Sequence, residues 1–158
     1  MTAQSRAEFD LLMTRLTAQA SGRALDQRLE QDLNQCFPAS GTDYRHVLQA
    51  CQAGITEGWL CEREAGGIRY GRAIKPGPQT HGFSVDVVSM PPIIGPHHAH
   101  PNGEIDLVMP LEPNAKFDGR GAGWLVYGPG SAHNPTVTDG RALVLYLLPA
   151  GAIEFTRR

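Results

Sequence analysis

The chain has 158 residues, of which 41% are hydrophobic and 19% charged, and its formal net charge at pH 7 is −2. This length and composition are typical of one globular domain that can bury a workable core. A near-neutral charge offers no basic surface for a polyanion, so we expect no nucleic-acid partner. No stretch approaches the roughly 20 apolar residues of a membrane helix, so we expect no membrane partner.

The first part of the chain has the spacing of amphipathic helices. Apolar residues recur every three or four positions in three stretches, Phe9 to Leu16, Leu25 to Leu33 and Tyr44 to Cys51. We therefore predict that residues 1–58 form a helical segment that packs on the remainder of a single domain.

The N-terminal residues and the cysteines bear on where the protein is located. The N-terminus is polar and lacks the apolar core of a signal peptide. The three cysteines are Cys36, Cys51 and Cys61, and none of them forms a CxxC pair. We expect reduced thiols in a cytoplasmic protein.

From Trp59 onward the pattern changes to short strands. Five apolar or alternating runs are bounded by Gly, Pro or Asp-Gly turns: Ile68 to Ile74, Phe83 to Met90, Ile105 to Met109, Trp124 to Tyr127, and Ala142 to Leu148. Many short strands at regular spacing are typical of a β-sandwich or a closed barrel. The last run does not alternate, which predicts a strand buried on both faces. The fold class is therefore mainly β, with a β-sandwich or a closed barrel over residues 59–158.

Four of the six histidines lie between positions 97 and 133. Residues two apart on a strand share a face, so His98 and His100 should project together. The turn after His100 can return Glu104 to the same place, and a Gly-Pro-Gly turn precedes His133 on a neighbouring strand. Three imidazoles and one carboxylate suit a divalent ion such as zinc, iron, manganese, nickel or cobalt. We predict one such ion, bound by these four residues.

The same residues carry a resemblance to a known superfamily. His98-x-His100-x-x-x-Glu104 resembles the first cupin motif, and Gly130-x-x-His133 resembles the second. Gly128 stands where the second motif commonly has proline, and Leu111 stands where the first usually closes with glycine. These departures affect turn residues and leave the ligand positions intact. The resemblance implies a single cupin-type jelly-roll β-barrel and, because such barrels often pair, a homo-oligomer, with a dimer favoured.

A longer resemblance runs over nearly the whole chain. The helical first part is similar to the 4-hydroxylaminobenzoate lyase family of bacterial 4-nitrobenzoate degradation, as are the segments 57–61, 67–72, 81–86, 95–110 and 123–133. The resemblance implies a metal-dependent lyase acting on a small aromatic carboxylate. Such an enzyme converts 4-hydroxylaminobenzoate and water to protocatechuate (3,4-dihydroxybenzoate) and ammonia.

Side-chain parity predicts how this chain could serve that reaction. Asp106 lies two residues beyond Glu104, so both carboxyl groups should face one cavity and form the catalytic pair, with Asp106 as general acid or base. The alternative is that Asp106 is a solvated strand residue or supports a ligand histidine.

An aromatic carboxylate needs a cation and flat apolar walls. If their face of the strand is inward, Arg72 can bind the carboxylate while Tyr70 lines the ring. Trp124 and Tyr127 are further wall candidates, although either could belong to the core. Two other functions stay open on the same fold: a dioxygenase that uses ferrous iron, and a small-molecule-binding protein without turnover.

Overall fold

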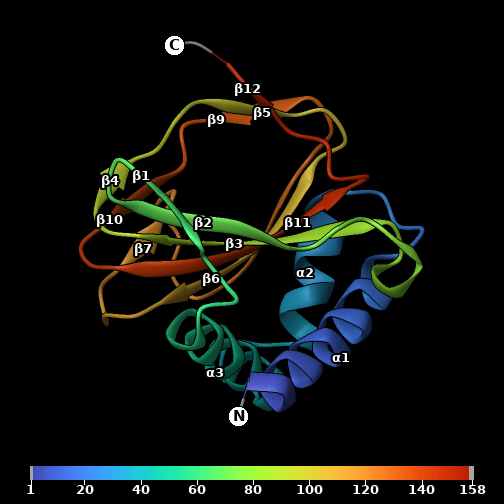
Figure 1. Ribbon diagram of the computed structural model, residues 1–158. Coiled ribbons are helices and arrows are strands. Elements are labelled where there is room, and N and C mark those ends of the chain that lie inside the picture. Colours follow the sequence, from blue (N-terminus) through green and yellow to red (C-terminus); the bar gives the residue numbers. More distant parts are fainter. Residues whose placement is uncertain (1, 157–158) are drawn as a thin grey trace.

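The computed structural model describes residues 2–156, with side chains described from residue 5 onward (Figure 1). Three helices come first, α1 (Thr2–Ala20), α2 (Gln27–Cys36) and α3 (Thr42–Glu57). The Asp26 side chain caps α2 by accepting a hydrogen bond from the Leu29 amide at 3.0 Å. Gly58 ends α3 in the left-handed region at φ 90°, where a side chain would be strained. The three predicted helical stretches correspond to these helices, except that Leu25 precedes the start of α2.

The strands of the described residues are antiparallel and fall into three sheets. The largest sheet has the order β1 (Arg63–Ala65), β2 (Ile68–Ile74), β3 (Phe83–Met90), β11 (Ala142–Pro149), β6 (Glu104–Pro110) and β8 (Gly123–Tyr127). A second sheet has the order β4 (Ile93–Ile94), β10 (Thr136–Thr138) and β7 (Lys116–Phe117). The third has the order β12 (Glu154–Phe155), β5 (His98–His100) and β9 (Ser131–His133). A short 3-10 helix, η1 (Pro78–Thr80), precedes β3.

The two faces of the six-stranded sheet have different neighbours. Helices α1 to α3 lie against one face, and the sheet β12–β5–β9 lies beyond the other (Figure 1). Strand β11 pairs with β3 on one side and β6 on the other, and it is buried on both faces, as its sequence predicts. The sheet is thus positioned to separate a helical core from the space that holds the histidines.

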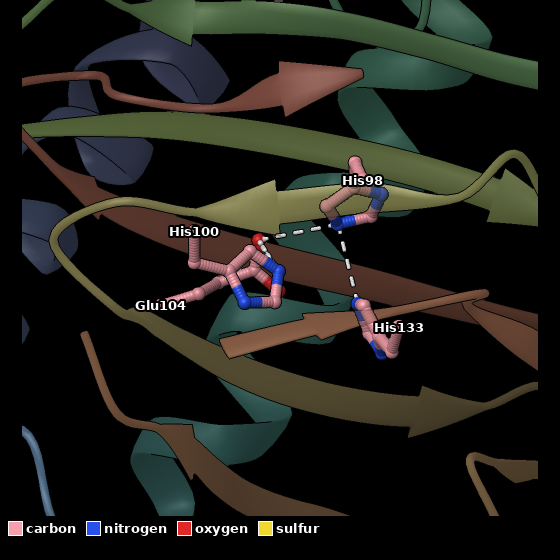
Figure 2. A group of neighbouring side chains, drawn as sticks. All are labelled: His98, His100, Glu104 and His133. Atoms are coloured by element: carbon pink, nitrogen blue, oxygen red, sulfur yellow. Dashed lines mark hydrogen bonds and ion pairs between the residues drawn. The ribbon is translucent and has the colours of Figure 1, made fainter. Parts of the chain in front are cut away.

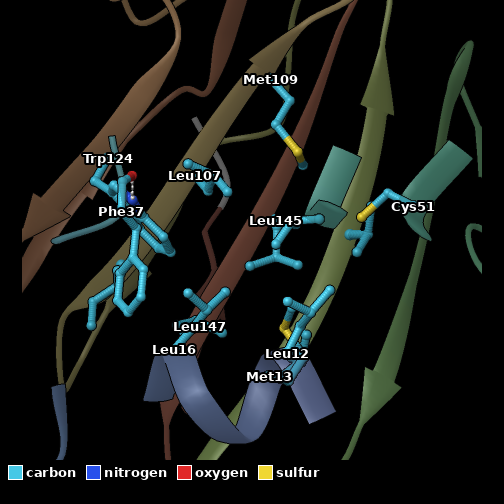
Figure 3. Packing of buried hydrophobic residues seen from close by; sticks show 14 of the residues in the cluster. Leu12, Met13, Leu16, Phe37, Cys51, Leu107, Met109, Trp124, Leu145 and Leu147 are labelled. Atoms are coloured by element: carbon cyan, nitrogen blue, oxygen red, sulfur yellow. Dashed lines mark hydrogen bonds between the residues drawn. The ribbon is translucent and has the colours of Figure 1, made fainter. Parts of the chain in front are cut away.

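The core on the helix side joins all three helices to the sheet. Leu12, Met13 and Leu16 of α1 pack in the same apolar cluster as Leu107 and Leu145 of the sheet (Figure 3). These side chains are almost fully buried, and each such burial is worth roughly 1.5–3 kcal/mol. The helical segment is therefore an integral part of the core that supports β6 and β11.

All three cysteines are free, and Cys51 and Cys61 are buried. Burial raises the pKa of the Cys61 thiol to about 11, so it stays protonated at neutral pH. No helix among residues 2–156 is both long enough and apolar enough to cross a membrane.

Candidate metal centre and active site

The four predicted ligands come together in the structure. One ligand atom from each of His98, His100, Glu104 and His133 lies within 4.8 Å of the others (Figure 2). Strand β5 contributes two histidines on one face because they are two residues apart. His133 of β9 is the cross-strand partner of His98, and Glu104 is the first residue of β6 after the turn. The predicted turn and strand pairing therefore produce the cluster.

The atoms that converge are the Nε2 nitrogens and one carboxylate oxygen. His98 Nε2 lies 3.2 Å from His133 Nε2. Glu104 Oε1 lies 3.3 Å from His100 Nε2 and 4.0 Å from His98 Nε2. A metal ion that accepts bonds from several nitrogen and oxygen donors would satisfy all of them at once.

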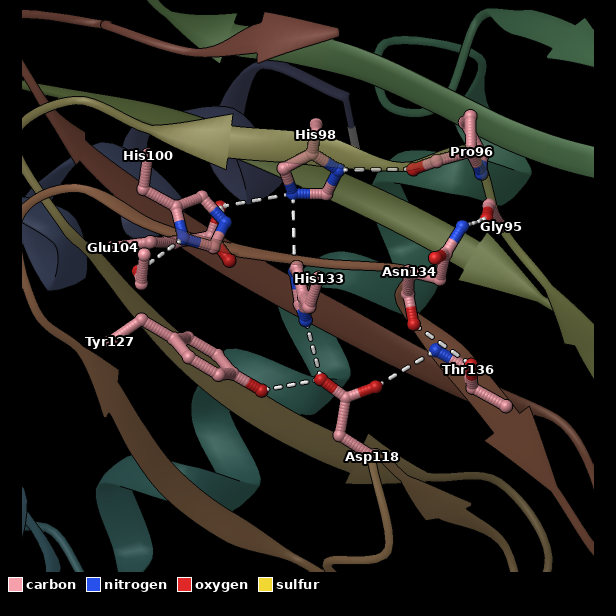
Figure 4. Close-up of polar contacts among 11 residues, drawn as sticks. Gly95, Pro96, His98, His100, Glu104, Asp118, Tyr127, His133, Asn134 and Thr136 are labelled. Atoms are coloured by element: carbon pink, nitrogen blue, oxygen red, sulfur yellow. Dashed lines mark hydrogen bonds and ion pairs between the residues drawn. The ribbon is translucent and has the colours of Figure 1, made fainter. Parts of the chain in front are cut away.

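The other ring nitrogen of each histidine has its own partner (Figure 4). His98 Nδ1 lies 3.3 Å from the Pro96 carbonyl oxygen, and His100 Nδ1 lies 2.9 Å from Ser131 Oγ. His133 Nδ1 lies 2.6 Å from Asp118 Oδ2. Partners of this kind fix the orientation and tautomer of a ligating imidazole, and here they leave Nε2 directed at the cluster.

Asp118 anchors this arrangement through three hydrogen bonds. Besides its contact with His133, Oδ2 accepts a hydrogen bond from the Tyr127 hydroxyl at 2.5 Å, and Oδ1 accepts one from the Thr136 amide at 2.9 Å. Burial alone would raise the pKa of Asp118, but these three bonds outweigh it and lower the pKa. Asp118 is therefore a carboxylate at neutral pH, and it can hold the His133 Nδ1 proton.

Two of the three histidines, His98 and His100, have lowered pKa values. Burial, followed by the nearby His133, lowers the pKa of His98 to about 4. Burial, followed by His98, lowers the pKa of His100 to about 3. Both rings are neutral at pH 7, as metal binding requires.

Unsatisfied polar atoms provide a test of whether these residues fit a metal. Among the described residues, the buried side-chain nitrogen and oxygen atoms without a hydrogen-bond partner belong only to His100, Glu104 and Asp106. Buried polar atoms normally have partners, and a missing one costs roughly 1–3 kcal/mol. His100 Nε2 and Glu104 Oε1 both face the cluster, so a divalent ion fits this donor set.

A cavity of about 310 Å³ opens beside the cluster. His98, Glu104, Asp106 and His133 form its polar end, and apolar side chains form most of the remaining wall. Asp106 thus faces the same cavity as Glu104, as the two-residue spacing predicts. Burial, and next the adjacent Glu104 carboxyl, raise the pKa of Asp106 well above its usual value. Asp106 therefore has the chemistry of a proton donor.

Tyr70 and Arg72 are two residues apart on β2, but only Tyr70 lines the cavity beside the histidines. Tyr70 lines the first cavity and also a second one of about 530 Å³, whereas Arg72 lines only the second. The Arg72 guanidinium donates from Nε to Asp86 Oδ1 at 2.9 Å and from Nη2 to the Gly151 carbonyl at 3.2 Å. The Arg72 guanidinium, the cation predicted to bind the substrate carboxylate, therefore lies in the cavity next to the one that holds the histidines. It already has one carboxylate partner, Asp86.

The structure places Trp124 away from the cavity. Its side chain is 2% exposed and packs against Phe37 on the helix side of the sheet, where Nε1 donates to the Phe37 carbonyl at 3.0 Å (Figure 3). Of the two alternatives for Trp124, a wall of the substrate ring or the core, the structure shows the core. Residues three apart on a strand point to opposite faces, so Trp124 and Tyr127 do not share a side of the sheet.

Tyr127 does lie on the histidine side. Its ring centroid is 4.7 Å from that of His133, but its hydroxyl is directed to Asp118 and it does not line the first cavity. Tyr127 therefore holds the Asp118 carboxylate that contacts His133, and it is not part of the wall of the first cavity.

Sequence reasoning missed several residues that shape this site: Asp118, Ser131, Tyr146, Ile153 and Phe155. Tyr146 had a visible signal, since it is the one residue with a polar group in the apolar run 142–148, and it lines both cavities. Asp118 and Ser131 lie on turns and strand starts whose pairing cannot be read from spacing.

The chain is similar to known proteins of one family. A family model described as PnbB, 4-hydroxylaminobenzoate lyase, matches residues 11–155. A relative from Nocardioides sp. (strain LMS-CY), named 4-hydroxylaminobenzoate lyase, is 33% identical over 142 residues and covers 84% of each chain. A relative of the same name from Pseudomonas putida is 30% identical over 155 residues, covering 87% of this chain and 88% of its own.

Solved structures with a similar fold include an RmlC-like cupin protein from Ralstonia eutropha JMP134. It has a TM-score of 0.46 and 12% identity, over 63% of this chain and 66% of its own. The strands of the described residues confirm the predicted mainly β fold, with one correction. The described strands form three separate sheets and do not pair around into one closed barrel.

Proposed function

The chain belongs to the 4-hydroxylaminobenzoate lyase family, and we propose that it converts 4-hydroxylaminobenzoate and water to protocatechuate and ammonia. The observation that carries this proposal is the convergence of three imidazoles and a carboxyl group at the polar end of an otherwise apolar cavity. A small aromatic molecule with one reactive polar group suits a cavity of this kind.

The reaction sets three chemical requirements. The N–O bond must break, with its electron pair leaving on an oxygen that takes up protons and departs as water. The ring carbon next to the C–N bond must gain a water oxygen, and the C–N bond must be hydrolysed to release ammonia. Two waters enter and one leaves, so the net reaction consumes one water and needs no external oxidant or reductant.

His98, His100, Glu104 and His133 would hold the divalent ion. When bound there, a divalent ion supplies Lewis acidity toward a hydroxylamine oxygen or toward water. Asp118 and Ser131 keep the imidazole rings of His133 and His100 in the orientation that directs Nε2 to that ion.

Asp106 is the proposed proton carrier. Its carboxyl is fully buried at the polar end of the cavity, and neither of its oxygens has a hydrogen-bond donor from another residue. A neutral carboxyl in this position can give a proton to the departing oxygen and later accept one from water. Glu104, two residues earlier, completes the predicted pair as a metal ligand that keeps Asp106 protonated.

Arg72 and Tyr70 are the proposed carboxylate side of the site. Arg72, Asp86, Tyr146 and Asp106 are successive cross-strand partners on β2, β3, β11 and β6. Three strand spacings of ~4.8 Å separate the Arg72 backbone from that of Asp106, a span that fits two side chains and a para-substituted benzoate between them. The ring would pass Tyr70 and Tyr146, which line both cavities.

Anaerobic incubation of the purified protein with 4-hydroxylaminobenzoate tests the proposal, with ammonia and protocatechuate followed over time and metal content measured. We expect both products in equal amounts without oxygen. Products that form only with oxygen uptake would indicate a dioxygenase and contradict the lyase. Tight binding without turnover would indicate a small-molecule-binding protein.

The homodimer and the cytoplasmic location stay predictions. The three free cysteines are compatible with a reducing compartment. Light scattering on the purified protein, and fractionation of the source cells, would test the two expectations.

A further inference from the structure

The C-terminal segment lies directly against the strand that carries two metal ligands. Strand β12 pairs with β5, with Phe155 opposite His98 and Glu154 opposite Ala99. The Thr156 amide donates to the His97 carbonyl at 3.0 Å, and the Thr156 hydroxyl also contacts the His97 ring. The segment is therefore held at one fixed register beside the metal centre.

Two apolar side chains of this segment face the substrate space. Ile153 and Phe155 are two residues apart on the chain. Both line the cavity that holds His98, Glu104 and His133, called the metal cavity below, and the neighbouring cavity lined by Arg72, called the Arg72 cavity. Glu154, between them, is exposed. Alternation of this kind gives the segment an apolar inner face and a charged outer face.

Phe155 is unusual because it is large, apolar and 66% exposed. Its ring centroid lies 5.5 Å from that of His98, at an interplanar angle of 58°. One edge of the ring thus contacts a metal ligand while much of its surface stays open at the boundary of the two cavities. An exposed aromatic surface at a cavity wall is available to a ligand.

The opposite wall of the metal cavity is also apolar. It includes four residues of the six-stranded sheet, Ile68, Tyr70, Val88 and Val144. Strand β12 belongs instead to the three-stranded sheet β12–β5–β9, called the outer sheet below. A flat ring whose reactive group lies at the metal centre would have sheet side chains on one face and the β12 side chains on the other. Apolar contacts on both faces favour a planar ring over a puckered one.

We propose that Ile153 and Phe155 form the outer wall of the substrate-binding site and that Phe155 determines its specificity for a planar aromatic ring. The identity of the substrate rests on the proposed function, but the preference for a planar ring rests only on the two walls. Phe155 is a specificity residue and takes no part in proton transfer or metal binding.

The test compares Phe155→Ala and Phe155→Leu with wild-type protein of measured metal content. Calorimetry gives the Kd of two probes that are not turned over, 4-hydroxybenzoate and trans-4-hydroxycyclohexanecarboxylate, and kinetics give KM and kcat for 4-hydroxylaminobenzoate. Leu11→Ala is the matched control, because Leu11 is another large apolar side chain, 71% exposed, on helix α1.

We expect Phe155→Ala to raise the Kd of 4-hydroxybenzoate and the KM by about tenfold, with kcat changed by less than about threefold. The cyclohexane probe should bind almost as it does to wild type, so the preference for the planar probe shrinks. Phe155→Leu keeps apolar volume without a ring, so its Kd and KM should lie between those of wild type and those of Phe155→Ala. Leu11→Ala should match wild type.

If both Phe155 variants bind the two probes with wild-type affinity, the proposal that Phe155 forms a wall of the substrate-binding site is wrong. A loss of metal from Phe155→Leu would also overturn it, because Phe155 would then act by holding His98. Should Phe155→Ala not fold in a thermal melt, the Phe155→Leu values decide. Absence of ammonia release by wild type would reject the proposed function alone, since the probe affinities do not depend on turnover.

Discussion

The two faces of the six-stranded sheet share the same strands but differ in chemistry. Along β6, Ile105, Leu107 and Met109 enter the core beneath the helices, whereas Glu104 and Asp106 face the metal cavity. Along β11, the leucines on either side of Tyr146 are in the helix-side core, and Tyr146 itself lines the cavity. One-residue alternation thus separates a packed core from a reactive site.

Among the described residues, every buried side-chain nitrogen or oxygen atom that lacks a hydrogen-bond partner lies on the cavity face. Even the indole N–H of Trp124 has a carbonyl acceptor on the helix side. On the cavity face, His100, Glu104 and Asp106 hold the buried polar atoms that lack partners among the described residues. The two faces therefore differ in their buried polar atoms, and the atoms that lack partners on the cavity face are available for a ligand.

The largest effect should come from removing a metal ligand. We expect His100→Ala and Glu104→Gln to lose bound metal and at least about a thousandfold of turnover, because a polarising ion is worth several kcal/mol in a transition state. Elemental analysis and the ammonia assay measure both. His46→Ala removes an exposed histidine of α3 and should keep metal and rate. Full metal content in the ligand variants would show that the site is wrong.

Asp106→Asn should leave metal in place and still reduce turnover. General acid–base catalysis typically contributes about 10²–10⁴-fold, so we expect kcat to fall by at least about a hundredfold with KM little changed. Steady-state kinetics measure the two constants separately. Asp10→Asn, an exposed change on α1, is the control. An unaltered kcat would remove Asp106 from the mechanism.

Asp118→Asn tests the support of His133. Loss of the charge-assisted bond at 2.6 Å should weaken metal affinity by about 10–100-fold, the usual cost of losing a partner of a ligating histidine. Competition with a chelator measures this affinity. Tyr127→Phe removes only the hydroxyl group that donates to the same oxygen, so it should weaken metal affinity less than Asp118→Asn does. Equal affinity in all three proteins would contradict the supporting role.

Arg72→Gln should act mainly on substrate binding. We expect KM for 4-hydroxylaminobenzoate to rise about tenfold, as for the loss of a charge-assisted hydrogen bond, with little change for uncharged phenylhydroxylamine. Arg69→Gln is the matched control, because Arg69 is an exposed arginine elsewhere on β2. Equal effects on the charged and uncharged substrates would count against carboxylate binding.

Trp124→Phe should have the smallest effect on chemistry. It removes the hydrogen bond to the Phe37 carbonyl and part of a buried ring, so the free energy of unfolding should fall by about 1–3 kcal/mol. Turnover per bound metal should match wild type. Denaturant unfolding and the ammonia assay measure the two quantities. A large loss of turnover at full metal content would mean that the two faces are not independent.

Much of the site could be predicted from the sequence because strand periodicity determines which side chains share a face. His98 with His100, and Glu104 with Asp106, follow from spacing alone, and the tight turn between them brings the pairs together. The same rule, applied to Trp124 and Tyr127, would have separated them. Local patterns were therefore sufficient to bring the four candidate ligands together and to locate the strands that carry them.

The remaining features depend on contacts between distant segments. Asp118 reaches His133 because β7 and β10 pair beside it, and its backbone adopts φ 50°, a conformation that spacing does not reveal. Phe155 reaches His98 only through the β12–β5 pairing. Arg72 was assigned to the correct strand, but a bulge after it and the partner Asp86 decide where its guanidinium lies.

The four ligands do not belong to one sheet, because the histidines lie on β5 and β9 of the outer sheet and Glu104 begins β6 of the large sheet. A bound cation would link two separately paired parts of the fold, so part of its binding energy would appear as folding energy. Cells short of the ion would then hold less folded protein as well as less active protein. A melting temperature that falls on treatment with a chelator, and recovers when the ion is returned, would reveal this dependence.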